Sequence, residues 1–199
     1  QIAIGSLPRL MRRAAADFPR HAGYLRADAA RVAAWHTRLK EMASGHCVGI
    51  AWRGGTAKTR RDLRSIPLAG LAPLFRVSRI TYVNLQRDAD PALAEIASAH
   101  GGRVLRFDEI LDDVDETAAL LQALDGVITA DNTVAHLAGA LGCRTMIMLP
   151  RSADWRWRRE GATSSWYPSV QLYRQRRHSD WTEVLAEIAR ALSVLEGQQ

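Results

Sequence analysis

The segment 131–136, Asp-Asn-Thr-Val-Ala-His, is the part of this sequence best suited to chemistry. A short apolar run over 126–130 ends there, and a helix rich in small residues is predicted to begin directly afterwards. The main-chain amides of Asn132, Thr133 and Val134 would point outwards with the positive end of the helix dipole, which attracts anions. Asp131 is expected to cap the helix.

His136 follows Asn132 by four residues, so both side chains could face one cleft. The segment is therefore either a ligand site or a well-capped helix with a satisfied histidine. These residues alone leave both interpretations open.

A second candidate is the basic loop 53–65, RGGTAKTRRDLRS. It contains neither the G-x-G-x-x-G spacing of dinucleotide-binding folds nor a P-loop. Its glycine pair and its cations could meet a diphosphate from one side, and the alternative is a disordered basic loop. Its cations are Arg53, Lys58, Arg60, Arg61 and Arg64.

A third loop, 150–169, combines arginines with four aromatic residues: Trp155, Trp157, Trp166 and Tyr167. These rings could stack on a base or a sugar, or they could fix the loop to the core. We expect packing for most of them. Because Trp155 and Trp157 alternate, only one of the two is expected to face inward.

These loops need a scaffold, and the chain alternates apolar runs with helical patterns. Strands are predicted at 46–52, 79–86, 104–107, 126–130, 144–150 and 169–175. Helices are predicted at 91–100, 116–124 (capped by Asp115), 132–141 and 180–195, and an earlier one follows a cap at Asp28. This rhythm predicts an α/β fold, a Rossmann-like doubly wound parallel sheet that binds ligands beyond the carboxyl ends of its strands. We expect a helical arm over 1–43 and the Rossmann-like domain over 44–199.

Composition narrows the function classes. The 199 residues are 47% hydrophobic without a run long enough for a membrane span. Cys47 and Cys143 are too few for a disulfide framework or a zinc site, which favours buried thiols and a reducing, cytoplasmic location. The net charge of +6 would suit nucleic acid, but no base-reading motif accompanies it, and we expect no nucleic-acid partner. The acidic segment 108–116 is expected to be a solvated loop with a helix cap.

Several segments in a fixed order resemble the C-terminal glycosyltransferase-like domain of bacterial tetratricopeptide-repeat proteins. That domain is related to the lipopolysaccharide heptosyltransferases and, more distantly, to the O-linked N-acetylglucosamine transferases. The similarity covers almost the whole chain, including SLPRL and YLRAD near its start. The segments are VGIAWRGG, RSIPLAGLAPLF, VNLQ, DETAALLQALDGVITADNTVAHLAGALG, DWRW, SSWYPSVQLYRQ and the last DW.

The resemblance implies the C-terminal, donor-binding half of a GT-B architecture in an inverting glycosyltransferase. The segment 131–136 would lie at the diphosphate of a nucleotide sugar, with His136 stabilising the leaving group and Asp131 accepting from a sugar or ribose hydroxyl. The loop after the first strand would supply a cation there, for which Arg53, Lys58 and Arg64 are candidates. Ser65 and Gln86 match positions near the donor cleft, and 107–117 would lie near the nucleobase. The resemblance implies no metal or other cofactor. It also implies a protein or glycan acceptor, and an upstream domain or helical repeats in the same protein.

The chain departs from the family pattern at two places. Asn132-Thr133 stands where the family has a threonine followed by a small residue, and Thr163 stands where it has an aspartate before Trp-Tyr-Pro. These departures motivate the alternative hypothesis, a non-catalytic interaction or regulatory module.

Overall fold

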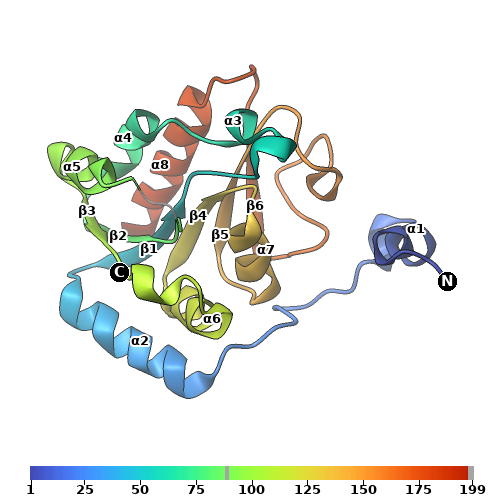
Figure 1. Ribbon diagram of the computed structural model, residues 1–199, viewed down its shortest axis with the longest axis horizontal. Coiled ribbons are helices and arrows are strands. Elements are labelled where there is room, and N and C mark those ends of the chain that lie inside the picture. The colour runs from blue at the N-terminus through green and yellow to red at the C-terminus, as the bar shows by residue number, and fades with distance from the viewer. Residues whose placement is uncertain (88–89, 197–199) are drawn as a thin grey trace.

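One parallel sheet of six strands forms the centre of the protein (Figure 1). The structure is a computed structural model that describes residues 1–87 and 90–196. The strand order is β3-β2-β1-β4-β5-β6, and every neighbouring pair is parallel. The strands are β1 (His46–Ala51), β2 (Ile80–Asn84), β3 (Arg103–Leu105), β4 (Gly126–Ala130), β5 (Thr145–Leu149) and β6 (Val170–Arg174). Because the chain reverses its direction of winding between β1 and β4, the sheet has its switch point there.

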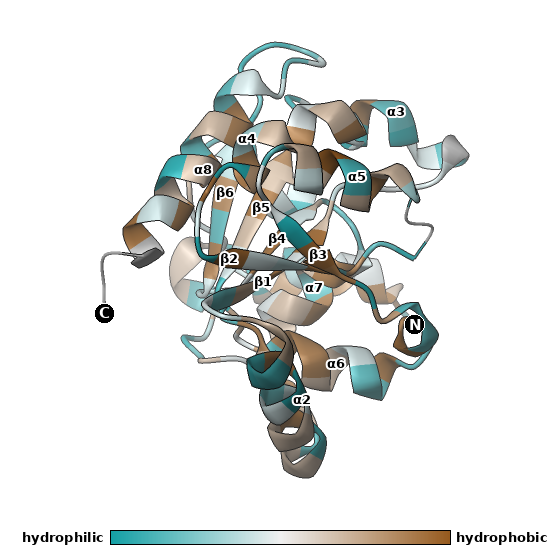
Figure 2. Cartoon of the chain, turned by 90° about the vertical axis from the view of Figure 1, so that its left-hand side faces the viewer, coloured by the Kyte–Doolittle hydropathy of each residue, from teal (hydrophilic) through white to brown (hydrophobic). Residues whose placement is uncertain are grey.

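Helices cover both faces of this sheet (Figure 1). One face carries α2 (Ala29–Met42), α6 (Val114–Ala123) and α7 (Thr133–Ala140), and the other carries α4 (Ala72–Phe75), α5 (Ala92–Ala99) and α8 (Thr182–Glu196). The short helices α1 (Leu7–Met11) and α3 (Arg61–Arg64) complete the set, and α3 is largely hydrophilic (Figure 2). Within the described ranges, no helix has the length and hydropathy needed to cross a bilayer.

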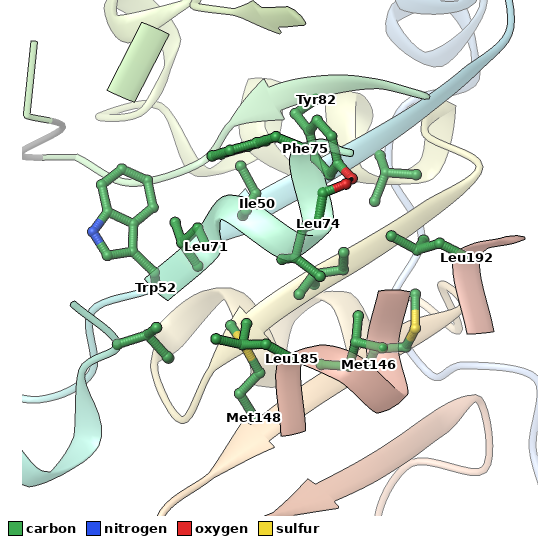
Figure 3. Close-up of a cluster of buried hydrophobic side chains, with 14 of the residues drawn as sticks. Ile50, Trp52, Leu71, Leu74, Phe75, Tyr82, Met146, Met148, Leu185 and Leu192 are labelled. Atoms are coloured by element: carbon green, nitrogen blue, oxygen red, sulfur yellow. Dashed lines mark hydrogen bonds between the residues drawn. The ribbon is translucent and has the colours of Figure 1, made fainter. Parts of the chain in front are cut away.

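The two-sided cover explains why the strands read as continuous apolar runs. In β1, Ile50 faces the layer of α4 and α8, whereas Cys47 faces the layer of α2 and α6. Figure 3 shows the first of these layers, where Leu74, Tyr82 and Leu192 gather. The Tyr82 hydroxyl donates to the Leu74 carbonyl at 2.5 Å, so this buried polar atom is satisfied.

The predicted alternation of strands and helices is confirmed, and so is the cap at Asp28, whose carboxylate accepts from the Arg31 amide at 2.9 Å. The prediction of a cap at Asp115 is wrong. Helix α6 begins at Val114 and is capped by Asp113, which accepts from the Asp115 amide at 2.9 Å. Asp113 is the better cap because its backbone is extended, which lets its side chain turn back towards the first turn.

The arm reaches the sheet domain through a close backbone contact with α7. Gly142 has φ +77, and a Cβ there would stand 1.8 Å from the Ala22 carbonyl oxygen, so only glycine fits. Tyr24 and Leu25 donate their amides to the Ala140 carbonyl at 2.7 and 3.0 Å. The arm therefore lies along the end of α7, while α1 stands apart from the sheet (Figure 1). The proposed division at residue 43 remains a prediction.

Candidate functional site

A cleft of about 780 Å³ lies beyond the carboxyl ends of β1, β2 and β4, at the switch point of the sheet. Ligands of open α/β sheets bind at this place. One part of its wall is polar and comes from the loop after β1 and the start of α7. The other part is mainly apolar and comes from the arm, α6 and α7: Tyr24, Leu25, Leu111, Val114, Leu137 and Ala140.

Asn132 fixes the polar wall. Its Oδ1 accepts from the Ala135 amide at 3.2 Å and from the Thr129 hydroxyl at 2.9 Å, and its Nδ2 donates to the Arg53 carbonyl at 3.0 Å. One amide side chain therefore joins β4, α7 and the loop after β1. The assignment of the cap to Asp131 is wrong, because Asn132 is the residue just outside the first turn with extended backbone.

This cap leaves the first amides of α7 available. In the described part of the chain, the amides of Thr133 and Val134 have no protein acceptor, and both residues line the cleft. Two unpaired N–H groups at the positive end of a helix dipole are suited to an anionic oxygen.

Asp131 directly precedes this helix start, and it is 1% exposed. Its Oδ2 forms an ion pair with Arg64 Nη2 at 2.6 Å, and its Oδ1 accepts from Trp157 Nε1 at 2.8 Å. Arg64 Nη2 also donates to the Asp131 carbonyl at 2.9 Å. The guanidinium neutralises the carboxylate, which removes the repulsion that a bare carboxylate would exert on a nearby phosphate.

The loop after β1 is held by the other predicted residues. The Gln86 side chain accepts from the Arg53 amide at 3.0 Å, and the Ser65 hydroxyl accepts from the Gly54 amide at 3.3 Å. A Cβ on Gly54 would stand 2.7 Å from the Asp131 carbonyl oxygen, so glycine permits this loop to lie against the β4–α7 turn. Arg53, Gln86 and Arg64 line the cleft, whereas Lys58 is exposed on the 3₁₀ turn Ala57–Thr59 and is not among the lining residues.

His136 also lines the cleft, and two aromatic residues hold it. Its ring is stacked on Trp157 at 5.1 Å between centroids and 16° between planes, and its Nδ1 lies 3.1 Å from the Tyr167 hydroxyl. Burial lowers the pKa of His136 and outweighs the neighbouring Asp131, which raises it. The ring therefore tends towards its neutral form.

The expectation for the aromatic loop is confirmed, since Trp157 is buried and Trp155 is 55% exposed. Sequence reasoning missed that these packed rings are also functional neighbours. Trp157 binds Asp131, and Tyr167 binds His136. Trp157 and Tyr167 each carry a polar atom that needs a hydrogen-bond partner when buried, and this requirement could have identified them from the sequence as neighbours of the site.

The remaining predicted segments reach the site in part. From 107–117, Leu111, Val114 and Thr117 line the cleft, as does the arm residue Tyr24. The geometry thus joins an anion-binding end to a larger apolar end, which suits a ligand with phosphate and ring parts. The individual roles of the predicted donor-binding residues remain predictions.

Comparisons with known proteins agree with this geometry at the level of the fold. No protein-family model matches the chain. Protein FlbA of Caulobacter vibrioides is 29% identical over 194 residues, which are 96% of this chain but 32% of that protein. The chain thus spans about a third of the length of that relative.

Two solved structures from E. coli are similar. ADP-heptose lipopolysaccharide heptosyltransferase II aligns with a TM-score of 0.59 and 17% identity, over 94% of this chain and 59% of that one. Heptosyltransferase WaaC, solved with ADP-2-deoxy-2-fluoro heptose, aligns with a TM-score of 0.46 and 16% identity, over 83% of this chain and 47% of that one. The first alignment confirms the Rossmann-like fold, which is that of a domain of the GT-B heptosyltransferases.

Proposed function

We propose that this chain is the donor-binding half of an inverting, metal-independent glycosyltransferase, and that its cleft holds a nucleotide sugar. The observation that carries the proposal is the start of α7. Two amides that have no acceptor among the described residues open onto a cleft that also has Arg53, Arg64 and His136 in its wall. The heptosyltransferase II that shares the fold acts with ADP-heptose, which is such a donor.

The charges at the polar end suit a leaving diphosphate. Asp131 and Arg64 form a pair of opposite charges, so the dipole of α7 faces the ligand without an uncompensated carboxylate beside it, and Arg53 is a further cation in the cleft wall. His136 adds a side chain that can donate a hydrogen bond. Fixed donors of this kind stabilise charge that develops on a leaving group, and in this proposal they take the place of a metal ion.

The apolar end suits the nucleoside. Leu111 precedes α6, Val114 begins it and Leu137 lies on α7, and all three line the cleft together with the exposed residue Tyr24. A purine or pyrimidine between such groups would bury its faces, and main-chain groups of 107–117 would bind its edge.

Acceptor activation is assigned to another part of the protein. Among the described residues that line the cleft, Asp131 is the one carboxylate, and its charge is paired with Arg64. A paired, buried carboxylate is a poor general base. We therefore place the general base and the acceptor site in an upstream part of the protein, together with any helical repeats. The enzyme in this proposal is cytoplasmic. The acceptor in this proposal is a protein or a glycan.

The cleft lining, in which the described residues offer no unpaired carboxylate, also motivates the second candidate. This candidate is a non-catalytic GT-B-derived interaction or regulatory module that binds the donor without turning it over. The two candidates differ in turnover by the full-length protein. Release of nucleoside diphosphate that depends on His136 supports the enzyme, and tight donor binding without turnover supports the module.

The test of donor binding is calorimetry of the 199-residue chain with ADP-, UDP- and GDP-sugars. We expect one donor to bind in the micromolar range and Arg53→Ala to weaken it at least about tenfold, because a hydrogen bond to a charged group contributes about 1.5–3 kcal/mol. Arg190→Ala on α8 removes the same charge outside the cleft and should leave the affinity unchanged. Binding at millimolar concentration or weaker for all three donors would contradict the proposal.

A further inference from the structure

The hydroxyl of Tyr167 controls one of the two nitrogens of His136. The hydroxyl oxygen lies 3.1 Å from Nδ1, and Tyr167 is only 7% exposed, so water competes little for this bond. In the described part of the chain, no protein group bonds to Nε2. The histidine therefore meets the protein with Nδ1 and has Nε2 left for a ligand of the cleft that it lines.

The direction of the bond follows from acidity. A phenol is a stronger donor than a neutral imidazole N–H, and an imidazole nitrogen is a stronger acceptor than a phenol oxygen. The Tyr167 hydroxyl has two partners, Tyr24 and His136, and the imidazole nitrogen is the stronger acceptor, so Tyr167 donates its O–H to Nδ1 and its oxygen accepts from the Tyr24 hydroxyl. Because the two nitrogens of a neutral imidazole take opposite roles, Nε2 then carries the hydrogen.

Packing holds Tyr167 where this bond requires it. A Cβ on Gly139 would stand 2.5 Å from Cγ of Tyr167, so the ring lies directly on α7 at a position that only glycine leaves open. The Ser164 hydroxyl accepts from the Tyr167 amide at 3.3 Å, and the ring of Tyr24 is stacked at 6.4 Å. The stack of His136 on Trp157 fixes the other ring, so neither partner can turn freely.

We propose that Tyr167 is a positioning residue that holds His136 as the Nε2–H tautomer, so that the imidazole offers the cleft a hydrogen-bond donor and no base. The identity of the ligand rests on the proposed function, in which an anionic oxygen of the diphosphate accepts this hydrogen. The tautomer itself is a property of the free protein. It assigns His136 to leaving-group stabilisation and assigns deprotonation of the acceptor to another residue.

The test is nitrogen-15 NMR of His136 in the 199-residue chain without ligand, at about pH 8, where the ring is neutral. The protonated and the bare nitrogen of a neutral imidazole resonate far apart, and the wild type should show the hydrogen on Nε2. In Tyr167→Phe the two resonances should move towards each other as the tautomers mix. Tyr173→Phe is the matched control, because the Tyr173 hydroxyl is buried without a hydrogen-bond partner among the described residues and its removal should leave His136 unchanged. Gly139→Ala, which displaces the Tyr167 ring, should reproduce the effect of Tyr167→Phe.

A hydrogen on Nδ1 in the wild type would overturn the proposal, and so would unchanged resonances in Tyr167→Phe. Donor affinity gives a second readout. If the competent tautomer falls to about half, the apparent affinity falls about twofold, because apparent affinity scales with the competent fraction. His136→Ala should weaken binding about tenfold or more by removing the donor outright. A wild type with the Nε2–H tautomer but no donor affinity would contradict the proposed function and leave the tautomer assignment standing.

Discussion

Asp131→Asn is the sharpest test of the charge arrangement behind α7. The substitution keeps the size of the side chain and an oxygen that can accept from Trp157 Nε1. It removes the negative charge from Arg64, whose side chain is 23% exposed, at a position where the aspartate side chain is 2% exposed. It also places an amide where the guanidinium needs an acceptor.

The expected loss follows from how far Arg64 is buried. Removing one partner of a fully buried ion pair costs about 3–5 kcal/mol, mostly because the other charge is left unpaired. Since water still reaches about a quarter of the Arg64 side chain, we expect the lower end, about 3 kcal/mol. For a protein of this size that corresponds to a fall in melting temperature of roughly 6–12 °C.

Urea unfolding followed by circular dichroism measures this loss, with an unchanged m value showing that the unfolded state is the same. The matched control is Glu183→Gln, which removes a carboxylate from the exposed pair with Arg176. That pair is solvent-screened, and its loss should cost less than about 1 kcal/mol. An Asp131→Asn variant within about 0.5 kcal/mol of the wild type would refute the reasoning, because surface substitutions behave in that way.

Three further predictions follow from backbone, proton and thiol chemistry. Gly142→Ala should lower the free energy of unfolding by about 3 kcal/mol or more because the arm must move, whereas Gly101→Ala, also at positive φ but with open space, should lower it by about 1 kcal/mol. Equal losses of the two variants in urea unfolding would count against the arm contact. Burial lowers the pKa of His136 in the folded state, so the unfolded chain binds the extra proton first, and this contribution to stability is lost as pH falls from about 6.5 through the folded pKa. His136→Gln should flatten the dependence of the free energy of unfolding on pH in that range, and an unchanged dependence would contradict the prediction. Burial raises the pKa of the Cys143 thiol to about 11, so iodoacetamide at pH 8 should modify it slowly in the native protein and rapidly in urea, and equal rates would show that the thiol is accessible.

The sheet was predictable because its signals are local. The apolar run 126–130 matches β4 as observed, and the helix predicted after it at 132–141 matches α7 to within one residue at each end. Period and length decide such elements before any tertiary contact forms. The placement of the candidate site followed from the same pattern, since loops after parallel strands meet at one edge of the sheet.

The contacts inside the site were not predictable in this way. Asp131 is joined to Arg64 across 67 positions of sequence and to Trp157 across 26, and nothing local distinguishes this aspartate from a helix cap. Asn132 was identified as a candidate ligand, but its side chain joins three segments through three hydrogen bonds. Which polar groups serve the scaffold and which face the ligand depends on distant partners, and these appear only in the folded chain.

The start of α7 can be tested directly by following backbone amides during a donor titration. The central claim is that the Thr133 and Val134 amides bind the diphosphate of a nucleotide sugar. The account predicts that these two amide resonances shift most in ¹H–¹⁵N spectra, and that the nucleoside diphosphate alone reproduces the shifts while the free sugar does not. Saturable binding that leaves both amides unmoved would contradict it.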